Sequence, residues 1–191
     1  MIFIIHKINK IKDLKKIDSI FGVEVDLRSE GPNIILHHNA FTKGELFKDY
    51  LAFYKHNFIV CNIKESGIEN EVIKILRKYN IVNYFLLDVE FPFILESFKL
   101  KFKNIAIRES KYEQYEYKNI KSFYSNFNWA WIDTYNKINI NKLKNLNKYK
   151  CLVCPSRWGK YEDIEFYKNL ISKKNNIDAI MTDFKNLKWW L

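Results

Sequence analysis

The sequence is poor in the residues from which flexible linkers are made, with only 5 Gly and 3 Pro among 191 residues. This scarcity excludes collagen-like and low-complexity chains, and it disfavours a linker between domains. Apolar residues make up 48% of the chain and charged residues 28%, as in ordinary globular proteins. We therefore expect residues 1–191 to form a single domain, which is long enough to bury a continuous core.

Long apolar runs are also missing. The N-terminal run Ile2–Ile5 is too short for a signal peptide or a membrane span. No other stretch approaches the ~18 apolar residues that a transmembrane helix needs. We expect a cytoplasmic protein without a transmembrane segment. The terminal segment 188–191 contains two Trp, which leaves peripheral membrane contact open, although packing against the domain is the favoured expectation.

Cysteine is scarce, and the count of 3 is odd, which fits a reducing compartment. Cys151 and Cys154 have the spacing of a redox motif but lie in an apolar, β-branched run. In a strand, residues three apart point to opposite faces. The two thiols should therefore not act together, and we expect them to be buried and structural.

Charge is strongly biased, with 32 Lys and Arg against 22 Asp and Glu and a net charge of +10. The lysines are scattered rather than clustered, which is typical of a solvated surface and favours anionic ligands only modestly. Specific nucleic-acid binding would require clustered Arg and exposed aromatic residues on a recognisable platform. A nucleic-acid-binding module is therefore the least favoured of three functional hypotheses.

Short apolar runs that end on a polar residue recur along the chain. They cover residues 2–6, 23–27, 58–64, 84–88, 105–108, 129–133, 151–154 and 179–183. Helical periodicity separates several of them, at 42–54, 69–79 and 163–171, with short connectors at 13–20 and 92–98. Strands alternating with helices predict a parallel sheet. Eight runs predict an α/β fold, a compact (β/α)8 TIM-like barrel with some short or missing helices. An open doubly wound sheet is the disfavoured alternative, because no Gly-rich phosphate loop follows the first run.

The expected strands end in polar residues that bear useful chemistry. These residues are His6, Asp26, Lys64, Asp88, Arg108, Asp133 and Asp183. Catalytic residues of a TIM-like barrel lie at the carboxyl ends of its strands, so we expect these side chains to converge on one face.

Two acidic residues in the second run predict a cation site. Glu24 and Asp26 are two positions apart in one expected strand, so both side chains point to the same face. Paired carboxylates repel each other unless a proton or cation intervenes, and oxygen ligands favour Mg²⁺ or Ca²⁺. The alternative is an ordinary ion pair between Glu24 and a lysine such as Lys64.

Two histidines accompany this acidic pair. His6 follows the first run and His38 follows the run 34–36. The neighbouring His37 should face the opposite side of an extended segment. Histidines titrate near neutral pH and can exchange protons as general acid and base.

These motifs together resemble those of the glycerophosphodiester phosphodiesterase family, within the larger group of phosphatidylinositol-phospholipase-C-like phosphodiesterase barrels. The resemblance rests on His6, on Gly-Val-Glu-Val-Asp-Leu at 22–27, on Ile-Ile-Leu-His-His-Asn at 34–39 and on Asn-Ile-Lys at 62–64. The ends of the later expected strands also match, so the likeness spans nearly the whole chain. Its specific part lies within the first 64 residues.

The resemblance implies a divalent-metal-assisted phosphodiesterase of phospholipid metabolism, acting on a glycerophosphodiester or a related small phosphodiester. It assigns Glu24, Asp26 and Asn62 to Mg²⁺ or Ca²⁺ and assigns acid–base catalysis to His6 and His38. It also assigns phosphate binding to Lys64, with Arg108 and Arg157 as weaker candidates. In many relatives a substrate hydroxyl attacks first and gives a cyclic phosphate.

The chain departs from the family pattern at three places. Lys7 follows the first histidine where the family commonly has Arg, and Asn39 replaces the usual Asp. Asn62 replaces the third acidic ligand, so we expect weaker metal binding, unless Glu65 or Asp88 supplies the missing carboxylate. These departures support the second hypothesis, a degenerate barrel that binds a phosphorylated ligand without catalysis. The leaving group, the product form, the native metal and the oligomeric state are not specified by the sequence.

Overall fold

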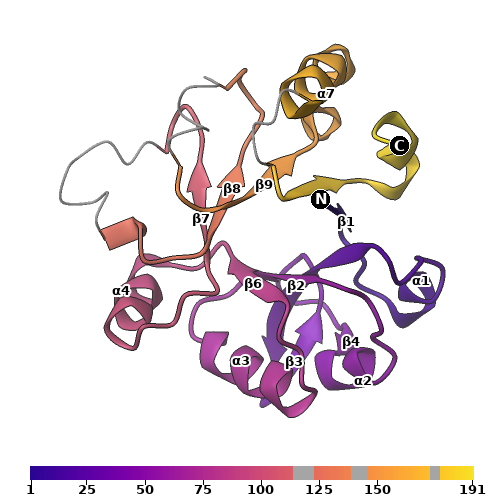
Figure 1. Cartoon of the computed structure of the whole chain (residues 1–191). Coiled ribbons are helices and arrows are strands. Elements are labelled where there is room, and N and C mark those ends of the chain that lie inside the picture. The colour runs from indigo at the N-terminus through magenta and orange to yellow at the C-terminus, as the bar shows by residue number, and fades with distance from the viewer. Residues whose placement is uncertain (114–122, 139–145, 173–176) are drawn as a thin grey trace.

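The fold is a curled, ten-stranded mixed sheet, seen in a computed structural model that describes residues 1–113, 123–138, 146–172 and 177–191 (Figure 1). The strands are β1 (Ile2–Ile5), β2 (Gly22–Glu30), β3 (Asn33–Leu36), β4 (Glu45–Leu46), β5 (Ile59–Ile63), β6 (Tyr84–Leu87), β7 (Ala106–Glu109), β8 (Trp129–Ile132), β9 (Tyr149–Val153) and β10 (Ala179–Thr182). All eight apolar runs identified in the sequence are strands, so this part of the prediction is confirmed.

The prediction of a (β/α)8 barrel with alternating helices is wrong. The sheet is mixed because β3 pairs antiparallel with β2, and β4 pairs antiparallel with β3. The cause is a tight turn after Glu30, where Gly31 takes a left-handed conformation with a φ of 59°. This turn sends the chain directly back along β2, so that Leu36 pairs with Leu27. The run 34–36 is therefore the second arm of a hairpin rather than part of a loop leading to a helix.

The other strands pair in parallel. β1 lies between β2 and β10, β5 lies between β2 and β6, and β8 lies between β7 and β9. β9 also pairs with β10, and a single bridge between Leu86 and Ile105 links β6 to the segment before β7. Parallel pairing brings the carboxyl ends of these strands to the same edge.

The helices are few and mostly short. They are α1 (Ile11–Leu14), α2 (Phe47–Ala52), α3 (Glu69–Lys78), α4 (Phe91–Lys99) and α7 (Ile164–Ser172), with 3₁₀ turns at Pro155–Trp158, Tyr161–Asp163 and Phe184–Trp189. The helices predicted at 69–79 and 163–171 are confirmed. The one predicted at 42–54 is shorter, because residues 45–46 form β4 and the Thr42 hydroxyl bonds the carbonyl groups of Asn39 and Ala40 instead of capping a helix.

The inner face of the curled sheet carries an aromatic core. Phe85 is fully buried, with ring centroids 4.9 Å from Trp129 and 5.6 Å from Phe58. Residues of β1, β9 and β10 complete the same cluster, so strands that are distant in sequence meet inside the curl. The opposite face of β2 and β5 packs against α2 and α3. This inner core is the floor on which the polar residues described below rest.

The remaining expectations concern cysteines, membranes and the C-terminus. Cys151 and Cys154 are buried, as predicted, and Cys61 is also buried; all three thiols are free. Within the described residues, no helix has the length and apolarity required to cross a membrane. Trp190 is buried and donates its indole N–H to Cys154 Sγ at 3.3 Å, which confirms packing of the terminal segment, whereas Trp189 is about half exposed.

Candidate functional site

The inner face becomes polar at the carboxyl ends of the strands, where a cavity of about 130 Å³ opens above the aromatic core. All eight residues assigned to the site from sequence line this one cavity: His6, Glu24, Asp26, His38, Asn62, Lys64, Arg108 and Arg157. Strand alternation explains the grouping. On β2, for example, Val23, Val25 and Leu27 face the outer core while the acidic residues between them face inward.

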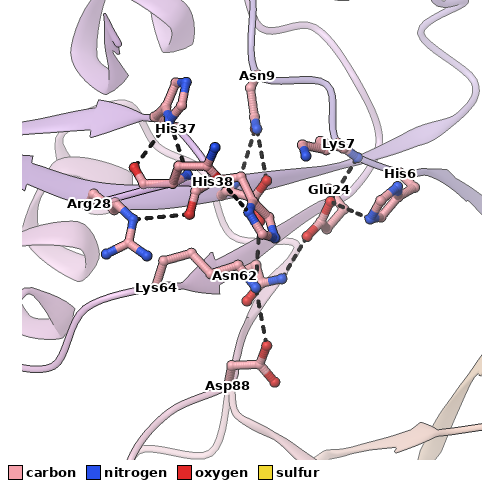
Figure 2. Close-up of polar contacts among 12 residues, drawn as sticks. His6, Lys7, Asn9, Glu24, Arg28, His37, His38, Asn62, Lys64 and Asp88 are labelled. Atoms are coloured by element: carbon pink, nitrogen blue, oxygen red, sulfur yellow. Dashed lines mark hydrogen bonds and ion pairs between the residues drawn. The ribbon is translucent and has the colours of Figure 1, made fainter. Parts of the chain in front are cut away.

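The acidic pair is deeply buried. Glu24 and Asp26 are each 1% exposed. The backbone N–H of Lys7 donates to Glu24 Oε2 at 2.7 Å (Figure 2). The side-chain amide of Asn9 donates to Asp26 Oδ2 at 2.8 Å. Burial and the neighbouring Asp26 raise the pKa of Glu24 above 4.5, although the hydrogen bonds from Asn62 and Lys7 and the nearby His6 partly offset the increase. Two close carboxylates in such a place are well suited to a cation.

Asn62 joins this pair from the neighbouring strand. Its position in β5 is directly opposite Asp26 in β2. Its Nδ2 group donates to Glu24 Oε1 at 2.8 Å, as Figure 2 shows. The other side-chain atom, Oδ1, is buried and has no hydrogen-bond partner within the described residues. A buried acceptor without a partner is costly, and a bound cation would satisfy it.

The residues present therefore fit Mg²⁺ or Ca²⁺. The donors are carboxylate oxygens of Glu24 and Asp26 together with the orphaned amide oxygen of Asn62, which is the all-oxygen set that hard cations prefer. Within the described part of the chain, no group of three or more His, Cys, Asp and Glu side chains is arranged to hold a metal. A site here depends on the neutral amide as third ligand, which favours weak rather than tight binding.

Lys64 extends the polar layer beyond the acidic pair. Its Nζ lies 3.6 Å from Asp26 Oδ1 and 3.4 Å from Asp88 Oδ2. The alternative interpretation predicted an ion pair between Glu24 and a lysine such as Lys64. Lys64 instead pairs with Asp26 and Asp88. The side chain is mostly buried but still lines the cavity, so its positive charge faces the space where a ligand would bind.

His6 is held by Asp183, a residue 177 positions away in the sequence. The Nδ1 atom of the ring lies 3.1 Å from Asp183 Oδ1, and Nε2 lies 3.9 Å from Glu24 Oε2. The hydrogen bond from His6 and the nearby Arg157 lower the pKa of Asp183, although partial burial opposes them. An ionised carboxylate can only accept, so Nδ1 carries the hydrogen and the other ring nitrogen, Nε2, faces Glu24 and the cavity.

His38 comes from the loop after β3 and is exposed at the mouth of the cavity. Its Nδ1 donates to the side-chain oxygen of Asn39 at 3.0 Å, which leaves Nε2 available to accept a proton. His37 does not line the cavity, and its Nδ1 accepts the backbone N–H of Asn39 at 3.0 Å. The expectation that one histidine of the pair faces the site is confirmed.

The two arginines assigned to the site are held by carboxylates. Arg108 binds Asp88 through Nη2 at 2.6 Å and through Nε at 2.7 Å, and its Nη1 lies 3.6 Å from Asp133. Arg157 lies 3.6 Å from Asp183. Both guanidinium groups are about one-third exposed, and both residues line the cavity. They are positioned to contact an anion.

Sequence reasoning missed several supporting contacts. Asn9, in the loop after β1, donates to Asp26 and accepts its backbone N–H through Oδ1, and Lys7 holds Glu24 through its backbone. Asp183 was recognised at a strand end, but its role as the partner of His6 was not. Glu65 is not a substitute ligand, because its carboxylate binds the backbone and hydroxyl of Ser29 and does not line the cavity.

Comparison with known proteins adds no assignment: no protein-family model matches the chain, and the curated proteins yield no significant match.

Proposed function

We propose that the protein is a divalent-metal-assisted phosphodiesterase that acts on a glycerophosphodiester or a related small phosphodiester. One observation carries the proposal: two histidines, a buried carboxylate pair with an orphaned amide oxygen, and three cationic side chains line a single cavity. Cleavage of a phosphodiester requires proton transfer, charge neutralisation and a fixed phosphate. The histidines, the candidate cation site and the cationic side chains supply these in turn.

The histidines supply the proton transfers. A hydroxyl next to the phosphate, or water, attacks phosphorus and forms a new P–O bond while the bond to the leaving alcohol breaks. One of His6 and His38 accepts the proton of the nucleophile through Nε2, and the other donates a proton to the departing oxygen. Asp183 fixes the ring of His6, and Asn39 fixes that of His38, so both reactive nitrogens are oriented before substrate arrives.

The cationic residues hold the phosphate. Lys64, Arg108 and Arg157 are partly exposed toward the cavity while carboxylates restrain their positions. Glu24, Asp26 and Asn62 would hold the cation, which when bound neutralises phosphate oxygens and makes the nucleophile more acidic. Trp158 stands at the rim, with its ring 5.4 Å from that of Tyr135, and forms a wall for one arm of the substrate.

The test is phosphorus NMR of a panel of phosphodiesters with Mg²⁺, Ca²⁺ or a chelator. The panel contains glycerophosphodiesters, lysophospholipids and sugar-linked diesters, each incubated with wild-type protein and with His38→Ala. We expect turnover that requires the metal and is lost in the variant, and the product shift distinguishes a cyclic phosphate from a monoester. A folded wild-type protein that turns over no member of the panel with either metal would overturn the proposal.

A second candidate is a non-catalytic receptor for a phosphorylated ligand. The observation in its favour is Lys64, whose ammonium group lies 3.6 Å from Asp26 and partly neutralises the acidic pair without a metal. This function predicts that glycerol phosphate binds equally well with chelator present and that binding survives the double variant H6A/H38A. The phosphodiesterase instead predicts metal-dependent turnover that either histidine substitution removes.

A further inference from the structure

A second and larger hollow lies beside the candidate site. This groove, which we call the lysine groove, has a volume of about 560 Å³ and is lined by residues of the loop after β1, of α1 and of the loop after β3. Three of its lining residues are Lys7, Lys10 and Lys43. Neither the acid–base chemistry nor the cation site proposed above uses these lysines.

The lysine groove is joined to the site by shared residues. His38 lines both the groove and the cavity. Lys7 and Asn9 also line the groove, and they hold Glu24 and Asp26 through hydrogen bonds; Figure 2 shows Lys7 beside Glu24. A molecule whose phosphodiester occupies the cavity can therefore extend one arm past His38 into the groove.

The lining of the lysine groove has an excess of positive charge, with three lysines against two acidic residues. Among the described residues, no ion pair or side-chain hydrogen bond engages the ammonium groups of Lys7, Lys10 or Lys43. Of the acidic residues, Glu45 accepts the backbone N–H of Ile11 at 2.6 Å, and Asp13 pairs with Lys16 at 3.5 Å. The lysines outnumber these carboxylates, so the groove favours an anion.

The backbone holds two of these lysines in place. Lys7 has a φ of 58°, in the left-handed region that few non-glycine residues adopt, and its N–H is tied to Glu24. Lys43 precedes Gly44, where an added Cβ would lie 2.5 Å from the carbonyl oxygen of Leu36. The loop that carries Lys43 therefore lies directly against β3, and its path depends on the absence of a side chain at residue 44.

From these observations we propose that the lysine groove is a subsite for a phosphomonoester on the leaving alcohol. This inference rests on the proposed phosphodiesterase function and specifies its substrate class. A phosphomonoester carries about 1.5 to 2 negative charges at neutral pH, and several unpaired ammonium groups in one groove match it in charge and number of donors. The preferred substrates are thus phosphodiesters with a second phosphate on one arm, rather than those with a choline or ethanolamine arm.

The test compares two substrates that differ by one phosphate: glycerophosphoglycerol, and the same diester with a phosphate on the terminal hydroxyl of the leaving glycerol. We expect kcat/KM of the wild-type protein to be about tenfold higher for the phosphorylated substrate, as several exposed ion pairs together provide. The double variant K10M/K43M should lose most of this ratio. Both lysines are exposed, so the variant should fold normally.

The control is K74M/K78M, which removes the same charge from the exposed surface of α3 and should keep the wild-type ratio. The inference is overturned if the kcat/KM ratio of the two substrates is near one in the wild-type protein, or if K10M/K43M keeps the wild-type ratio. If neither substrate is turned over, that result counts against the proposed function and not against the groove. The subsite is then tested by calorimetric titration of the same two molecules into the protein. A binding preference that K10M/K43M alone removes then supports the subsite, and equal binding refutes it.

Discussion

The two ends of the inner sheet face differ completely in chemistry although the same strands build both. At the amino-terminal end the inward positions are apolar and aromatic, such as Ile4, Val60, Phe85 and Trp129. Two to four residues further along the strands, the inward positions are acidic, basic or imidazole. Side chains of one face recur at every second residue, so the change from core to site takes place within one or two steps of the strand repeat.

The two ends also differ in how they affect the stability of the fold. The aromatic end is stabilised by burial of large rings, whereas at the polar end burial and the neighbouring Asp26 raise the pKa of Glu24 and disfavour its ionisation. Loss of volume at the first end should lower stability, whereas removal of a polar side chain at the second end should lower activity much more than stability. The predictions below test this division.

The largest effect is expected from the histidines at the polar end. His6→Ala should lower kcat for a cleaved phosphodiester by about 10²–10⁴-fold, because it removes one proton-transfer group. The free energy of unfolding should fall by only about 1–2 kcal/mol, because the substitution removes the hydrogen bond between His6 and Asp183. The measurement is steady-state kinetics alongside thermal unfolding. His56→Ala serves as control, since His56 does not line the cavity and its ring bonds the Phe21 carbonyl; equal losses in both variants would contradict the assignment.

At the aromatic end the effect should appear in stability. Phe85→Ala removes a fully buried ring that contacts Phe58, Trp129 and Trp131, and we expect a loss of about 3–5 kcal/mol in the free energy of unfolding. Urea denaturation measures it, with the milder Phe85→Leu as a second variant. Phe41 is a fully exposed phenylalanine, so Phe41→Ala should change stability by less than about 0.5 kcal/mol. Similar values for both sites would refute the contrast.

The acidic pair should behave in the opposite way to the aromatic core. Burial and Asp26 raise the pKa of Glu24, so its contribution to stability is present below pH 4.5 and is lost as the pH rises through the raised value. Glu24→Gln removes this loss and keeps one side-chain oxygen that can still accept the backbone N–H of Lys7. We expect the metal-free variant to be more stable than wild type by about 1–2 kcal/mol at pH 7.

The measurement is chemical unfolding with chelator between pH 4.5 and 7, where the advantage of Glu24→Gln should grow with pH. Glu71→Gln, at an exposed pair with Lys74, provides the control and should show no such trend. A variant that is less stable than wild type at pH 7 would mean that the carboxylate contributes to the apo fold.

The polar end was more predictable from sequence than the architecture. Strand alternation places Glu24 and Asp26 on one face, and parallel pairing brings the ends of most contributing strands together, while His38 reaches the same cavity from the end of the antiparallel β3. The barrel prediction failed at Gly31, where a tight turn makes the run 34–36 the second arm of a hairpin instead of a connection that leads to a helix.

The supporting contacts were beyond sequence reasoning for a different reason. Asn9 reaches Asp26 from a loop, and Asp183 reaches His6 from the last strand. Neither contact has a periodic or local signal in the sequence, because each is formed only when distant segments meet in the folded chain. The same holds for Gly44, whose requirement for a small residue follows from the approach of its loop to Leu36.

The central claim is that Glu24, Asp26 and Asn62 form a divalent-cation site, and the most direct test is calorimetric titration of Mg²⁺ and Ca²⁺ into three proteins. Wild type should bind one ion. Asn62→Asp should bind about tenfold more tightly, because it adds a third carboxylate, and Asn62→Leu should bind at least about tenfold more weakly. Absence of binding in both wild type and Asn62→Asp, or affinity that is the same in all three proteins, would contradict the claim.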